Sequence, residues 1–253
     1  MAISQWDEFT QWIPNARYIY THDAFPGEGM PESFSTFPAY PHGLAYVIYL
    51  TSRIAGHLAE NASGMFNIVL LACFGVMVGR VIRKAVTMRD PAARTPLGIA
   101  ALPAPQLGWG YCALGCLAVT ALNPTFVRKI VFTAYADTAT AVLVGMLCVL
   151  TWMLLNALAE EESDFPPTGL AVTAGLVAMA LIAVKQVNLV LFLLIAISGT
   201  IVALRDPAIP TGRFAKLLAI SVVPPIAIYF LWRLHVQING IGGEFSFTPY
   251  SEW

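Results

Sequence analysis

The sequence predicts an all-α integral membrane protein of about six transmembrane helices, with an external N-terminal cap of juxtamembrane helices and loops. Hydrophobic residues make up 57% of the chain and charged residues only 11%, whereas soluble domains carry roughly 25% charged residues. Apolar runs recur along the chain at the length of about 20 residues that a helix needs to cross a bilayer. Residues 1–63 are different, because they are rich in Trp, Tyr, Pro and acidic residues.

These observations divide the chain into an external segment at 1–63, a helical bundle at 64–232 and a short external tail at 233–253. The predicted spans lie at 64–81, 97–122, 138–158, 168–184, 187–204 and 214–232. Pro103 and Pro105 place the start of the second span nearer Gln106, and Pro224 and Pro225 are expected to kink the sixth.

Two connections are informative. Only Lys185 and Gln186 separate the fourth and fifth spans, so a tight hairpin is expected there. A further apolar stretch at 43–59 is interrupted by Arg53 and His57. We interpret it as a helix that lies at the membrane interface or enters the bundle from outside.

Basic residues in the loops set the orientation. Five of them lie in the last turn of the first span and in the loop after it, at positions 80, 83, 84, 89 and 94, which predicts a cytoplasmic loop. The external parts are then residues 1–63, residues 123–137, the Lys185-Gln186 turn and the tail. Arg128 and Lys129 go against this assignment, because it places these two basic residues outside. The net charge of −1, without a basic patch, gives no reason to expect a nucleic-acid partner.

The stretch WDEFTQW near the N-terminus combines acids with aromatics. Trp6, Phe9 and Trp12 fall near helical spacing, which is typical of a short helix at the headgroup level. Asp7 and Glu8 would then lie at the membrane surface, facing water or a cavity. The alternative is an ordinary interfacial helix with solvated acids.

WDEF followed by FPAYPHGLAYVIYL resembles the first external loop of the GT-C glycosyltransferases, membrane enzymes that use polyprenyl-phosphate-linked sugars. In that superfamily an Asp or Asp-Glu pair opens the loop, a juxtamembrane helix follows, and a Tyr-Pro-Pro or similar motif leads into an apolar segment. Asp7 and Glu8 match the acidic pair. Tyr40 and Pro41 match the later motif, with His42 where a second proline is common.

The resemblance implies inverting transfer of a sugar from a polyprenyl-phosphate or polyprenyl-diphosphate donor to a glycan, lipid or protein acceptor of the cell envelope, in a bacterial inner membrane. Asp7 would be the general base, and Glu8 its partner. The sequence identifies no cofactor with certainty; Asp7 and Glu8 are the expected ligands if a divalent ion such as Mg²⁺ or Mn²⁺ takes part.

The leaving phosphate calls for cationic and polar contacts on the external side. Lys185 is placed between two apolar spans with almost no loop to solvate it. Charges at such positions tend to be functional or paired, and the alternative is a lysine that snorkels to the interface. The candidates for substrate and phosphate binding are Lys185, Gln186, Arg128, Lys129, Tyr40, His42 and Asp137, with Arg233 as a further cation.

Two other classes stay open. The GT-C pattern has a membrane helix before the acidic loop, so we expect a fragment, a misplaced start or a helix supplied by a protein partner. That expectation favours a non-catalytic membrane subunit or scaffold of a larger complex. A transporter of lipid-linked sugars ranks third, because polar residues within the spans are few and mild: Asn67, Asn156, Asn188 and Ser198.

Overall fold

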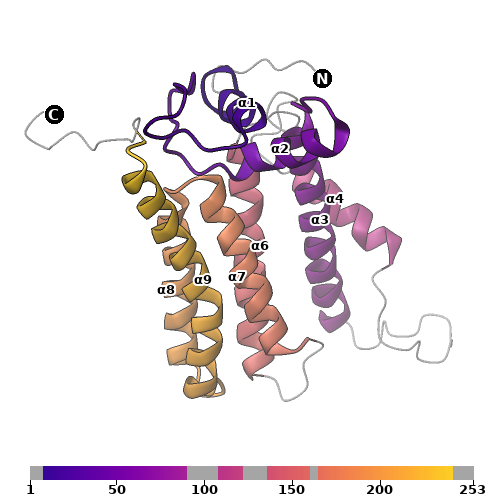
Figure 1. Cartoon of the computed structure of the whole chain (residues 1–253). Coiled ribbons are helices and arrows are strands. Elements are labelled where there is room, and N and C mark those ends of the chain that lie inside the picture. The colour runs from indigo at the N-terminus through magenta and orange to yellow at the C-terminus, as the bar shows by residue number, and fades with distance from the viewer. Residues whose placement is uncertain (1–7, 90–107, 122–135, 160–164, 242–253) are drawn as a thin grey trace, which may run out of the picture.

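The computed structural model describes residues 8–89, 108–121, 136–159 and 165–241, and these residues contain helices joined by turns and loops, with no strand among them (Figure 1). Two short elements come first, the π-helical turn η1 (Glu8–Trp12) and helix α1 (Ile13–His22). The remaining helices are α2 (Gly43–Ala55), α3 (Ala62–Arg89), α4 (Trp109–Ala121), α6 (Ala136–Ala159), α7 (Pro167–Val184), α8 (Asn188–Arg205) and α9 (Thr211–Ile238).

Five of these helices are long and apolar enough to cross a membrane. They are α3 up to Arg83, α6, α7, α8 and α9, and they coincide with five of the six predicted spans. Only α4 represents the remaining predicted span, 97–122, and it is shorter; residues 97–107 and 122 lie outside the described part. α9 continues through Pro224 and Pro225 as one helix. The chain therefore has the character of an integral membrane protein.

Small residues bring the helices of the bundle close together. Ala171, Ala174 and Ala178 of α7 are buried, and a Cβ atom added at Gly175 would meet the backbone oxygen of Ile220 in α9 at 3.1 Å. A Cβ added at Gly115 of α4 would meet the Gly75 oxygen of α3 at 2.0 Å. Such close backbone approach is characteristic of helices packed in membranes, where small residues let van der Waals contacts form.

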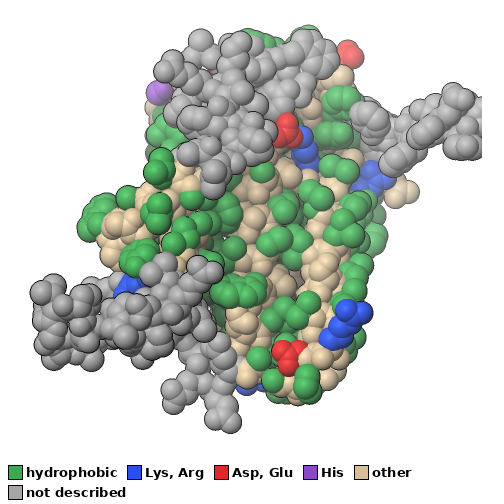
Figure 2. Space-filling view, turned by 180° about the vertical axis from the view of Figure 1, so that it is seen from behind, with side chains coloured by type: hydrophobic (Ala, Val, Ile, Leu, Met, Phe, Trp, Pro, Cys, Tyr) green, Lys and Arg blue, Asp and Glu red, His purple; other side chains and the backbone are tan. Residues whose placement is uncertain are grey.

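The flank of the bundle is apolar. α8 exposes a row of large hydrophobic residues, Val190, Leu194, Ile197 and Ile201, at helical spacing. In Figure 2 hydrophobic side chains cover the sides of the helices, and the visible Lys, Arg, Asp and Glu side chains lie toward the two ends. This distribution matches a surface that contacts lipid along its sides and water at its ends.

The cap, defined here as residues 8–61, lies across one end of the bundle (Figure 1). In α2 the residues at one helical face, Leu44, Ala45, Ile48 and Ser52, are buried, whereas Tyr46 and Leu50 are exposed. α2 begins at Gly43, where an added Cβ would meet the Ala183 backbone oxygen of α7 at 2.5 Å. The cap therefore docks on the bundle through a backbone contact with no room for a side chain.

Polar contacts tie the parts of the cap to one another. Arg53 at the end of α2 forms an ion pair with Asp23, and the Tyr49 hydroxyl donates to the same carboxylate over 2.9 Å. The Arg53 guanidinium also lies over the Tyr20 ring, 5.6 Å from its centroid. Arg53, which interrupts the apolar stretch in the sequence, thus holds α2 to the end of α1.

Candidate binding pocket at the cap end of the bundle

The structure reaches only part of the predicted acidic site. Asp7 lies outside the described residues, as do Arg128 and Lys129. Glu8 is the first residue of η1. In the described part of the chain, no group of three or more His, Cys, Asp or Glu side chains could hold a metal ion.

Two of the predicted residues form an ion pair. Lys185 Nζ, in the turn between α7 and α8, lies 2.5 Å from Asp137 Oδ1 in the first turn of α6. Next to it, Asn188 Nδ2 donates to the Leu181 backbone oxygen over 2.9 Å and to Thr140 Oγ1 over 3.1 Å. The α7–α8 turn is thereby attached to α6, and the positive charge of Lys185 already has a carboxylate beside it.

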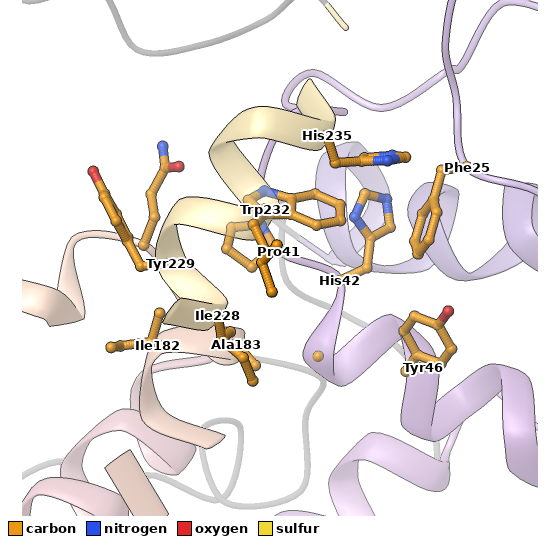
Figure 3. A pocket seen from close by; sticks show the side chains of 13 residues that line it. Phe25, Pro41, His42, Tyr46, Ile182, Ala183, Ile228, Tyr229, Trp232 and His235 are labelled. Atoms are coloured by element: carbon orange, nitrogen blue, oxygen red, sulfur yellow. The ribbon is translucent and has the colours of Figure 1, made fainter. Parts of the chain in front are cut away.

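A pocket of about 330 Å³ opens next to this turn, between the cap and the upper ends of α7 and α9 (Figure 3). It brings together two of the predicted residues, His42 from the cap and Gln186 from the turn. It is lined by Phe25, Pro41, His42, Gly43, Tyr46, Ile182, Ala183, Gln186, Ile228, Tyr229, Leu231, Trp232 and His235.

Four of these side chains form what we call the aromatic box: Phe25, His42, Trp232 and His235. The His42 ring centroid is 5.1 Å from that of Phe25 and 5.2 Å from that of Trp232. His235 makes the same two contacts, at 5.2 Å and 5.3 Å. Two histidines therefore share two apolar rings as walls, in edge-on, tilted and stacked arrangements that aromatic side chains favour.

His42 is buried, with 4% of its surface exposed, and neither ring nitrogen has a hydrogen-bond partner among the described residues. Burial lowers the pKa of His42 to about 4. The nearby backbone of Tyr40 opposes this shift, although it forms no hydrogen bond with the ring, and nearby His235 lowers the pKa further. His42 is therefore neutral at pH 7, with one N–H donor and one acceptor nitrogen.

The hydrogen bonds of His235 come from its neighbour Asn239. The Asn239 amide nitrogen donates to the His235 backbone oxygen over 2.8 Å and lies 3.2 Å from His235 Nδ1. Because that amide nitrogen can only donate, Nδ1 accepts, and the proton of the neutral ring is on Nε2. Nε2 has no partner in the described part of the chain, and neither has the buried Oε1 of Gln186.

Unsatisfied buried polar groups are costly, at about 1–3 kcal/mol each. Native proteins keep few of them, and each needs an explanation, such as a water or ligand that completes the hydrogen bonds. Here they belong to residues from three separate segments, the start of α2, the α7–α8 turn and the end of α9; these residues line the same cavity, although the atoms themselves are buried and the cavity surface is mainly apolar. The pocket is thus a candidate ligand site.

Tyr40 has a different place from the one its motif suggests. Its ring stacks on Phe37, with centroids 5.1 Å apart, and it does not line the pocket. The neighbouring Ala39 instead connects the cap to α9, because its backbone oxygen accepts a hydrogen bond from Trp232 Nε1 over 2.9 Å. The Tyr40-Pro41-His42 segment thus contributes Pro41 and His42 to the cavity.

The residues that sequence reasoning missed come mainly from α9. Trp232 and His235 lie in the last turns of a helix that was interpreted only as a span and the start of a tail. A signal was present, since the chain has only four histidines and His235 follows directly on a long apolar run. A polar residue at the end of a membrane helix is a candidate functional residue. Phe25 and Tyr46 carried no comparable signal.

In comparisons with protein-family models, with curated proteins and with solved structures, no match to this chain was found.

Proposed function

We propose that the chain is a GT-C-type membrane glycosyltransferase that transfers a sugar from a polyprenyl-(di)phosphate donor to a cell-envelope acceptor. The observation that carries the proposal is the convergence at one end of the bundle of Pro41 and His42, from the Tyr40-Pro41-His42 segment, with Gln186, which follows Lys185 in the α7–α8 turn. The sequence resemblance assigns both elements to the external side of such enzymes. Asp7 directly precedes η1, which belongs to the same cap.

In the proposed reaction Asp7 takes the proton of the acceptor hydroxyl as its oxygen attacks the anomeric carbon. The bond from that carbon to the phosphate oxygen breaks, and the phosphate leaves with the electron pair. The configuration at the anomeric carbon is inverted, because the scheme has one base and no covalent nucleophile. Lys185, Arg128 and Lys129 would stabilise the charge that develops on the leaving phosphate.

The location of the cap end fits this chemistry. A lipid-linked donor has its phosphate at the headgroup level and its tail in the bilayer, so a site at the end of the helices can contact both. We assign the cap end to the external face of a bacterial inner membrane, with the α4 region as one of six spans. The basic residues in the last turns of α3 and directly after it support this orientation.

Neither alternative gains a specific observation. Transport needs a polar path through the bundle, yet Asn188 and Ser221, two buried polar residues of the spans, donate to backbone oxygens of Leu181 and Ala171. They hold helices and turns together. The apolar outer face of α8 fits lipid as well as it fits a protein partner, so it does not favour the scaffold.

The test compares wild type with Asp7→Asn at matched expression in source cells that lack the native copy. We expect wild type to restore one defined sugar in the envelope glycans, measured by mass spectrometry. Asp7→Asn should lower the rate of sugar transfer by about 10²–10⁴-fold, so that little of this sugar is restored. Glu28→Gln, at an exposed acid of the same cap, is the matched control and should behave as wild type.

Equal restoration by wild type and Asp7→Asn would reject Asp7 as the base and favour the scaffold. A product that retains the anomeric configuration of the donor would contradict the inverting scheme while leaving sugar transfer in place.

A further inference from the structure

The surface of the pocket is apolar, although several residues around it are polar. The ring nitrogens of His42, Nε2 of His235 and Oε1 of Gln186 are buried in the protein and expose almost no surface, so they contribute little to the cavity wall. The wall is mainly apolar, and the described lining includes no Lys, Arg, Asp or Glu. Water is a poor occupant of such a space, because a buried water needs polar partners, whereas an apolar guest fits it.

The walls of the pocket come from both the cap and the bundle. Phe25 and Tyr46 belong to the cap, Ile182 and Ala183 lie in the last turn of α7, and Ile228 lies in α9. In Figure 3 the Phe25 ring and the Ile182 side chain lie on opposite sides of the cavity. A molecule that fills this volume of about 330 Å³ would therefore contact the cap and the bundle at the same time.

The pocket lies at the depth where lipid chains meet their headgroups. α7 has 18 residues and is therefore about 27 Å long, close to the roughly 30 Å of the hydrocarbon core of a bilayer. Ile182 and Ala183, in the last turn of α7, are then at the edge of that core. α9 has 28 residues and a length of about 42 Å, so its last turns, which include Trp232 and His235, extend beyond the end of α7.

The pocket is open toward the face of α9 that contacts lipid. Leu231 is part of the lining and is 63% exposed. Val223, Leu234 and Ile238 lie on the same face of α9 and are exposed as well. The cavity is thus continuous with the lipid-facing surface of the bundle, so a hydrocarbon chain can enter it without crossing water.

The lining has no means of selecting one headgroup or one scarce lipid. Its surface is mainly apolar and, in the described residues, without charge, so occupancy follows the concentration of each hydrocarbon chain and how well it fits. The most concentrated hydrocarbon around a membrane helix is the acyl chain of the surrounding phospholipid. An unselective apolar pocket is therefore expected to hold that chain.

We propose that the pocket holds an acyl chain of a bilayer phospholipid, which enters from the lipid-facing side of α9 and packs between the cap and the ends of α7 and α9. The headgroup stays outside the cavity. The chain is a structural lipid, because it contacts both the cap and the bundle and so favours the docked cap. This inference concerns binding, goes beyond the proposed sugar transfer and does not rest on it.

The experiment uses the full chain in nanodiscs of phosphatidylcholine with a small fraction of a photoactivatable phosphatidylcholine, which has a diazirine in the middle of one acyl chain. After irradiation, adducts are mapped to residues by mass spectrometry. We expect adducts at Ile182, which is 2% exposed and so out of reach of lipid outside the pocket. Leu194, on the exposed face of α8, reports labelling by the surrounding bilayer. Adducts at Leu194 without adducts at Ile182 would overturn the proposal.

A variant that fills the pocket tests the same point. Ile228→Trp places a larger side chain in the cavity wall and should lower the labelling of Ile182 by about tenfold relative to Leu194. Val223→Trp, at an exposed residue of α9 outside the lining, is the matched control and should leave both unchanged. Circular dichroism and size-exclusion chromatography check that the variants fold. Unchanged labelling of Ile182 in a folded Ile228→Trp protein would contradict a chain in the pocket.

Two comparisons on wild type test the source of the chain and need no variant. A photoactivatable phosphatidylglycerol with the same chains should label Ile182 as strongly as the phosphatidylcholine, because the headgroup lies outside the cavity. Unlabelled polyprenyl phosphate, added at the same small fraction of the lipid, should leave the labelling unchanged. A preference of about tenfold for one headgroup would overturn the proposal, and so would displacement by polyprenyl phosphate. Labelling requires no sugar transfer, so its outcome is independent of the Asp7→Asn experiment.

Discussion

Two neighbouring residues of one turn, Lys185 and Gln186, belong to sites of opposite character. Lys185 is in an ion pair with Asp137, whose side chain is 57% exposed, so this site is charged, open to water and internally neutralised. Gln186 lines a cavity with His42 and His235, whose described lining includes no Lys, Arg, Asp or Glu and is mainly apolar, and each of these three residues has a buried polar atom without a hydrogen-bond partner among the described residues. The cap end of the bundle therefore has two adjacent sites, the Lys185 site, which is suited to charged groups, and the Gln186 pocket, which is suited to neutral groups.

The largest effect on the difference between the two sites is expected from displacing the cap from the bundle. Gly43→Ala would place a Cβ at 2.5 Å from the Ala183 backbone oxygen and 2.8 Å from its carbonyl carbon, and neither atom can move independently of α7. We expect destabilisation of about 3 kcal/mol, as severe overpacking produces, with the neutral pocket opened and the Lys185–Asp137 pair retained. Thermal unfolding and limited proteolysis of the cap would measure this.

Gly212→Ala is the matched control, because an added Cβ there meets nothing within 4 Å. It lies at the start of α9, where alanine favours a helix over glycine, so stability should stay the same or rise slightly. A Gly43→Ala protein as stable as wild type would show that the cap does not dock through this contact.

A second effect, which reaches a similar size only near pH 4, separates the two sites by pH. The pKa of His42 is about 4 in the folded protein against an ordinary value of 6.5, so the unfolded chain binds a proton at higher pH than the folded one. The contribution of neutral His42 to the free energy of unfolding is therefore fully present above pH 6.5, and it is lost as the pH drops toward 4, by up to about 3 kcal/mol. Melting temperatures measured between pH 4 and 7.5 should show this decline.

His42→Phe should remove most of the pH dependence, since the ring that fails to protonate in the folded state is gone. His57→Phe should keep it, because that histidine is exposed. A decline of equal size in the His42→Phe protein would assign the pH dependence to other groups.

The smallest effect is expected at the charged site. A double-mutant cycle with Lys185→Gln and Asp137→Asn should give a coupling energy below about 1 kcal/mol, as for other ion pairs that water reaches. It should weaken further at high salt. A coupling energy of several kcal/mol would mean that water reaches the Lys185–Asp137 pair much less than its exposure indicates. The pair and the pocket would then differ in charge but not in contact with water.

Much of the fold could be predicted from local pattern. A run of about 20 apolar residues is sufficient to mark a span, which is why α3, α6, α7, α8 and α9 fall at the predicted positions. The interruption of the stretch at 43–59 by Arg53 was also informative, because α2 ends at Ala55 and lies at the end of the bundle.

The pocket could be predicted only in part. His42 and Gln186 stood out, one next to a proline motif and the other between two spans. Their partners Phe25, Trp232 and His235 depend on how the cap and the end of α9 meet, and no local pattern encodes a contact between segments so distant in the sequence. The sequence also could not show that Lys185 lies beside Asp137, 48 residues earlier.

The hydrogen bond from Trp232 to Ala39 spans 193 positions of the chain, and this distance has a consequence for biosynthesis. Residues 8–61 leave the ribosome long before α9 exists. Throughout that interval the wall formed by Trp232 and His235 is missing, so His42 remains open to the surroundings. The pocket is therefore completed late in synthesis, after α9 has been made and packs against the N-terminal segment.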